Sequence, residues 1–118
     1  MRERIKDVTR LYHIRKSIDN VLEFMDGKTY DSLMTDKLLF YGVVKNIEII
    51  GEASNMLTKE FRDRHAEQPW QDIIDMRHVL VHGYYTVSPR FIWDTYTNDL
   101  LPLRESIARY IAEIEQQE

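Results

Sequence analysis

Apolar residues recur along this chain at spacings of three, four and seven positions, the repeat of α-helices that bury one face. The first stripe predicts a helix over about residues 3–25, ended by Asp26-Gly27. It consists of Leu11, Ile14, Ile18, Val21, Leu22 and Met25. A second stripe predicts the longest helix, with Asp31 or Ser32 as its N-cap. It consists of Phe40, Val43, Val44, Ile47, Ile50, Ser54, Leu57 and Phe61.

Prolines mark where the later helices begin. Pro69 suits the first turn of a third helix that runs to about His82, and Pro89 opens a fourth. Pro102 marks either a kink or the start of a final helix. That last stripe consists of Leu103, Ile107, Tyr110, Ile111 and Ile114. The pattern therefore predicts one all-α domain over residues 1–118, built from four to five helices.

The second predicted helix has two features that point to neighbours. Gly51 and Ala53 are small, so another helix can approach closely there. A flexible hinge at Gly51 is the competing interpretation, and we favour close packing. Tyr41 and Ile49 lie off the main stripe and form a second apolar surface, which predicts a partner chain.

The third predicted helix carries an arginine on its apolar stripe of Trp70, Ile73, Ile74 and Val81. Because burying an unpaired guanidinium is costly, we expect Arg77 either to be paired or to line a cleft. Glu52 is either that partner or a surface charge.

Polar side chains gather where this helix ends. His78 and His82 are four residues apart and share a face about 100° round the helix from Arg77. Gly83 suits a left-handed helix terminus, and Tyr84 follows just beyond it. An arginine, two histidines and a tyrosine therefore form a candidate site.

Each of these residues also has a structural interpretation. The arginine could pair with a neighbouring helix, a histidine could complement the helix dipole, and the tyrosine could be a half-buried anchor. His78 and His82 have the spacing of metal ligands, but two histidines need further donors and there is no His-Glu-x-x-His motif. We therefore expect neither a metal nor another cofactor.

Composition narrows the class of protein. The 118 residues include no cysteine, which excludes disulfides, a thiolate nucleophile and cysteine-bound zinc and fits a reducing cytoplasm. We expect neither a signal segment nor a membrane span. The net charge of −4 argues against a protein that coats nucleic acid, although Arg62, Arg64 and His65 form a local basic cluster.

The motif resembles a known family. Arg77, His82 and Tyr84 match the Arg-x4-His-x-Tyr signature of HEPN-domain ribonucleases. The segments 50–53 (Ile-Gly-Glu-Ala) and 69–84 look like the HepT toxin subfamily in particular. His78 stands where this family often has a small polar residue. The resemblance extends over nearly the whole chain.

The resemblance implies an all-α HEPN-type bundle that forms a two-fold homodimer, with the motif helices facing each other. It implies a metal-independent endoribonuclease with Arg77 and His82 as catalytic residues. From their positions, His78, Tyr84 and Glu52 are candidate supporting residues. Histidine suits proton transfer near neutral pH, and arginine suits the charge on a phosphate. The expected substrate is single-stranded RNA or tRNA, and the expected product carries a 2′,3′-cyclic phosphate.

The same resemblance implies a toxin–antitoxin partner. Tyr84 resembles the tyrosine that a nucleotidyltransferase antitoxin of the MntA type adenylylates (AMPylation). The alternative function is a non-catalytic helical module that binds such a nucleotidyltransferase.

Overall fold

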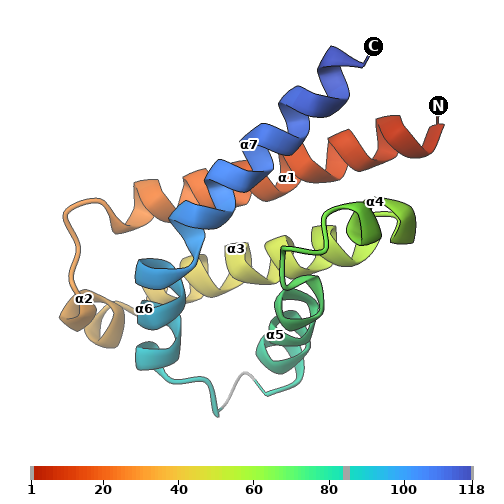
Figure 1. Ribbon diagram of the computed structural model, residues 1–118. Helices are drawn as coiled ribbons and strands as arrows, with labels where there is room; N and C mark the ends of the chain where they lie inside the picture. Colours follow the sequence, from red (N-terminus) through yellow and green to blue (C-terminus); the bar gives the residue numbers. More distant parts are fainter. Residues whose placement is uncertain (1, 84–85, 118) are drawn as a thin grey trace.

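The computed structural model describes residues 2–83 and 86–117, with side chains from Asp7 onward. These residues form seven helices and no strand, so the all-α prediction is confirmed (Figure 1). The helices are α1 (Arg2–Met25), α2 (Tyr30–Thr35), α3 (Lys37–Met56), α4 (Lys59–Arg64), α5 (Trp70–His82), α6 (Pro89–Asn98) and α7 (Leu100–Gln116). None of the described helices is long and apolar enough to cross a membrane.

The described residues form more helices than the four to five predicted, because the second predicted helix is divided into α2, α3 and α4. Asp36 ends α2 and also caps α3, where its carboxylate accepts a hydrogen bond from the Leu39 N–H at 3.1 Å. Thr58 caps α4 in the same way. The predicted N-caps of the second helix are wrong, because Thr29 forms a capping box with Ser32. The longest helix is α1, with 24 residues.

The ends of the later helices agree better with the sequence pattern. Helix α5 begins at Trp70, directly after Pro69, and ends at His82. Helix α6 begins at Pro89. Pro102 lies in the first turn of α7, so it marks a new helix and not a kink.

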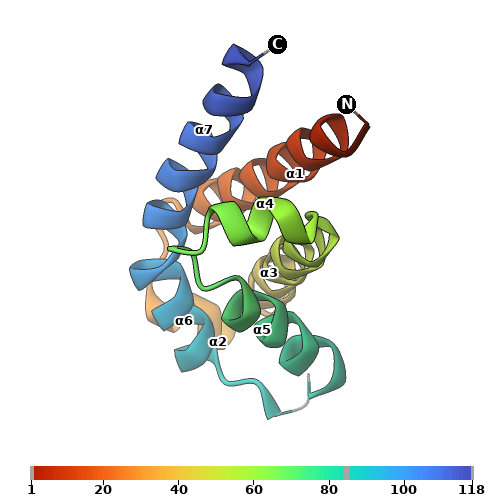
Figure 2. The same ribbon diagram turned by 45° about the vertical axis from the view of Figure 1, so that its right-hand side comes forward.

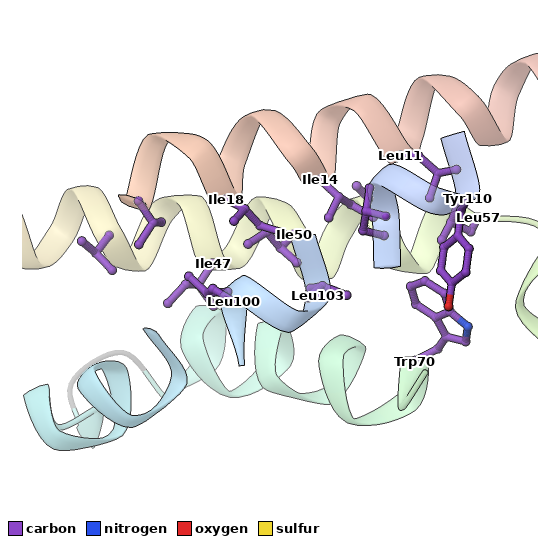
Figure 3. Close-up of a cluster of buried hydrophobic side chains, with 14 of the residues drawn as sticks. Leu11, Ile14, Ile18, Ile47, Ile50, Leu57, Trp70, Leu100, Leu103 and Tyr110 are labelled. Carbon is purple, nitrogen blue, oxygen red and sulfur yellow. The ribbon is translucent and has the colours of Figure 1, made fainter. Parts of the chain in front are cut away.

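Helices α1, α3 and α7 enclose most of the core. In Figure 1, α1 runs alongside α3 and α7 crosses α1, in agreement with the inter-helix contacts. Figure 3 shows the buried side chains between them, with Trp70 and Tyr110 adjacent at one end. Helix α5 packs chiefly on α3 (Figure 2). It also meets α7 through Trp70 and Tyr110, and α6 through Met76 and Thr95.

The local basic cluster predicted around His65 is a structural junction. The His65 side chain is only 16% exposed and lies between two carboxylates, 3.7 Å from Glu67 and 3.8 Å from Glu113. Its ring also packs on Tyr110, with the centroids 4.1 Å apart. This histidine therefore joins α4 to α7 and does not extend a basic surface.

Candidate active site

The site is built where α5 crosses α3 at Gly51. A Cβ atom at Gly51 would collide with the Cβ of Arg77 and would lie 3.0 Å from the carbonyl oxygen of Ile73. Only glycine permits this approach, so the prediction of close packing is confirmed and the hinge is unnecessary. The crossing brings the middle of α5 directly onto the residues around Glu52.

Arg77 is paired across this crossing. Its Nε atom lies 2.8 Å from Oε2 of Glu52, and the two side chains are 35% and 49% exposed. Within the described residues, Glu52 is the only carboxylate that forms an ion pair with Arg77. Of the two alternatives expected for Arg77 the structure shows the pair, and Glu52 is its partner and not an isolated surface charge. The guanidinium is held at the edge of the helix pair, where an anion from solvent can still reach it.

His78 and His82 lie one turn apart on the exposed side of α5. Their ring centroids are 4.5 Å apart, with 49° between the ring planes. No hydrogen bond or ion pair joins His82 to any other side chain in the described ranges. The His82 ring nitrogens are therefore open to a ligand from solvent, as far as the described residues determine their surroundings.

The end of α5 differs from the prediction. Gly83 is the C-cap with φ −116° and ψ 27°, so it is not left-handed. Its N–H donates to the Val79 carbonyl at 2.7 Å, and Thr86 donates from both its backbone N–H and its hydroxyl to the Gly83 carbonyl. A Cβ at Gly83 would lie 3.0 Å from that Val79 oxygen, so a larger residue would fit tightly here. Among the described residues, the glycine with positive φ is Gly27, at the end of α1.

The core face of α5 is rotated slightly from the predicted stripe. Leu80 is fully buried, whereas Val81 is half-buried. Arg77 and His82 are five residues apart, which places them about 140° apart round the axis and about 7.5 Å apart along it. One protomer therefore does not direct both side chains at a single point.

Two further predictions about this site concern Tyr84 and metal binding by His78 and His82. The predicted modification site, Tyr84, lies outside the described residues. In the part of the chain that is described, no group of three or more histidine and carboxylate side chains could hold a metal ion. His78 and His82 thus find no third ligand within the described ranges.

Comparison with known proteins assigns the family. Residues 14–110 match the family described as ribonuclease HepT-like. A protein of Caldanaerobacter subterraneus subsp. tengcongensis named "putative RNase" is 35% identical over 97 residues, covering 82% of this chain and 87% of that protein. The "probable ribonuclease HepT" of Thermococcus cleftensis is 33% identical over 94 residues, covering 80% and 86%.

A third relative is longer. It is a Methanocaldococcus jannaschii protein named "gamma-glutamylcyclotransferase and putative RNase", 35% identical over 106 residues. The match covers 90% of this chain but 48% of that protein, so the chain spans about half the length of this relative. No solved structure matches the chain. Because the family match extends from α1 into α7, this chain belongs to the HepT-like ribonuclease family.

Proposed function

We propose that this protein is a metal-independent endoribonuclease in which Arg77 and His82 act on one RNA phosphodiester. The observation that carries the proposal is the Arg77–Glu52 pair, which fixes a half-exposed guanidinium on the same helix as an exposed histidine that has no ion pair within the described residues. Those are the two kinds of group that cleavage by the ribose 2′-hydroxyl requires without a metal.

The proposed chemistry divides between the two side chains. His82 takes the proton of the 2′-hydroxyl, whose oxygen attacks phosphorus, or returns a proton to the 5′-oxygen as it leaves. Arg77 offers N–H donors to the non-bridging oxygens as negative charge grows on them. The expected products are a 2′,3′-cyclic phosphate and a free 5′-hydroxyl. Glu52 orients Arg77, and the ring contact with His78 restricts the rotation of His82.

We further propose that two copies form one active cleft about a two-fold axis. The 140° separation of Arg77 and His82 on α5 supports this, because the Arg77 of one copy can then face the His82 of the other. Each Arg77–His82 pair across the axis suffices for cleavage, with His82 making one proton transfer and water the other. The exposed Ile49 and Met56 flank Glu52 on α3 and provide an apolar surface beside the site.

The proposed biological role is that of a toxin acting in the cytoplasm on tRNA or other single-stranded RNA. A nucleotidyltransferase antitoxin of the MntA type would adenylylate Tyr84, which the Arg-x4-His-x-Tyr spacing supports. An added nucleotide close to His82 would both block and repel RNA. Intact-mass and peptide measurements after incubation with the partner and ATP test this step. A nucleotide on Tyr85 instead of Tyr84 would contradict it.

The activity is tested by cleavage of total RNA and tRNA in EDTA. Wild type is expected to produce fragments with cyclic-phosphate ends, and Arg77→Ala and His82→Ala are each expected to lose this activity. Cleavage that persists in both variants would contradict the assignment of the site. If folded, unmodified wild type does not cleave, the chain is instead a non-catalytic module that binds the nucleotidyltransferase.

A further inference from the structure

A groove of about 420 Å³ runs between α3 and the C-terminal end of α5. Helix α3 contributes one face between Phe40 and Glu48, and Val87 closes the groove from the segment before α6. The lining residues are Phe40, Tyr41, Val44, Lys45, Glu48, Leu80, Val81 and Val87. Because Leu80 and Val81 directly precede His82, the groove lies next to the proposed catalytic residue.

The lining of this groove also includes an aromatic and two charged side chains. Tyr41, Lys45 and Glu48 are spaced by four and three residues, so they share one side of α3. The Tyr41 side chain is 60% exposed and meets Phe40 edge-on, with the ring centroids 5.4 Å apart. Within the described residues, neither Lys45 nor Glu48 forms an ion pair or a side-chain hydrogen bond. An exposed aromatic ring, a free cation and a free carboxylate are thus available to one ligand.

We propose that this groove binds an unpaired nucleobase of the RNA, next to the phosphodiester that is cut. The base stacks on Tyr41, Lys45 contacts a backbone phosphate, and Glu48 accepts a hydrogen bond from an exocyclic amino group. Stacking on aromatic side chains is the usual way in which proteins hold single-stranded bases, and lysine neutralises phosphate. Glu48 would favour cytosine or adenine, which carry such amino groups.

The position of the groove fits a neighbouring nucleotide and not the reacting one. Tyr41 and Glu52 are separated by 11 residues of helix, or about 16 Å along the axis of α3. A single phosphate group therefore cannot contact both the groove at Tyr41 and the Arg77–Glu52 pair. The statement that the base adjoins the cleaved bond rests on the proposed function, whereas the binding of an unpaired base does not.

The test measures binding separately from cleavage, in His82→Ala protein, with a fluorescein-labelled single-stranded RNA of about 12 nucleotides. Adding Tyr41→Ala is expected to weaken binding about tenfold, whereas Tyr41→Phe retains most of the affinity. The same RNA as a duplex hides its bases, so Tyr41→Ala should leave duplex binding unchanged. Lys45→Ala should weaken binding and lower the salt dependence by about one phosphate contact.

Leu38→Ala is the matched control, because Leu38 is 86% exposed on the same helix but does not line the groove. It should bind single-stranded RNA as the parent does. Equal losses for Leu38→Ala and Tyr41→Ala would overturn the subsite. So would a change in oligomeric state on Tyr41→Ala, since the groove would then be a protein interface. Both variants replace exposed side chains, and circular dichroism checks that they remain folded.

The two proposals can fail separately. If wild type cleaves RNA and Tyr41→Ala cleaves and binds equally well, the base subsite is wrong and the catalytic assignment stands. If wild type does not cleave but binds single strands through Tyr41, the subsite stands and the ribonuclease mechanism is wrong.

Discussion

Replacing Gly51 by alanine tests the crossing that positions Arg77. Alanine is the better helix former by about 1 kcal/mol, so an unobstructed position would gain stability. At Gly51, however, the new methyl group would collide with the Cβ of Arg77 and press on the Ile73 carbonyl. Both atoms are fixed to the backbone of α5, so no side-chain rotation relieves the contact. Helix α5 must move away from α3.

The expected magnitude follows from these two opposing effects. Overpacking a helix contact costs about 1–3 kcal/mol, and a clash with backbone-anchored atoms belongs at the upper end. Subtracting the gain in helix propensity leaves a net loss of about 1–2 kcal/mol in the free energy of unfolding. For 118 residues, each kcal/mol corresponds to about 4 °C in Tm. Gly51→Ala should therefore lower Tm by about 4–8 °C.

Gly42→Ala is the matched control on the same helix. A Cβ at Gly42 would meet only the Phe24 ring, at 3.5 and 3.6 Å, which is ordinary contact. This variant should gain up to about 1 kcal/mol and raise Tm. Thermal and urea unfolding at one fixed protein concentration measure both variants, since self-association would otherwise shift Tm. A Gly51→Ala protein as stable as wild type would refute the close crossing of α5 on α3.

Three further predictions concern side chains that hold the helices and the site in place. Asp7 is 4% exposed and accepts hydrogen bonds from the backbone N–H and the hydroxyl of Thr58, both at 2.8 Å. Asp7→Ala should therefore lower the free energy of unfolding in urea by about 2 kcal/mol, and an unchanged midpoint would contradict this. The hydrogen bond from Tyr110 lowers the pKa of Glu67 below its ordinary 4.5, so this carboxylate adds stability above that pH, and the contribution is lost as the pH falls through the lowered value. Tyr110→Phe should therefore flatten the decline of stability on acidification below about pH 4.5, and an unchanged pH profile would argue against the bond. Glu52→Gln should reduce kcat at least about tenfold, because Glu52 positions Arg77. The free energy of unfolding should change by less than about 1 kcal/mol, because the ion pair is half-exposed. A kcat equal to that of wild type would show that Glu52 does not position Arg77.

Much of the site could be predicted because its physical demands are local. An arginine on an apolar helical stripe requires a partner, and Glu52 adjoins the small Gly51 that lets α5 approach. The second apolar surface on α3 was also predictable, since Tyr41 and Ile49 are both exposed. The groove beside Tyr41 was not, because it depends on how the end of α5 and Val87 lie against α3.

The helix breaks were missed for a different reason. The helices are interrupted at Asp36 and Thr58, but Leu57 and Phe61 are still buried in the core. The apolar repeat in the sequence therefore continues across both breaks. The contact between Asp7 and Thr58 joins residues 51 positions apart, which periodicity cannot reveal. At Gly83 the helix ends through a hydrogen bond to Val79, with a backbone that is not left-handed and with little space for a side chain.

The joint action of Arg77 and His82 across two protomers is tested most directly by mixing two inactive variants. Arg77→Ala and His82→Ala are unfolded together, refolded and assayed on RNA in EDTA, with native mass spectrometry to measure the mixed dimers. Half of the dimers should be mixed, and each then carries one intact Arg77 opposite one intact His82. Because half of the dimers are mixed and each keeps one of the two Arg77–His82 pairs, about a quarter of the wild-type activity should return. Arg77→Ala refolded with the double variant is the control and should stay inactive. No recovery despite abundant mixed dimers would show that the two residues do not act across the two-fold axis.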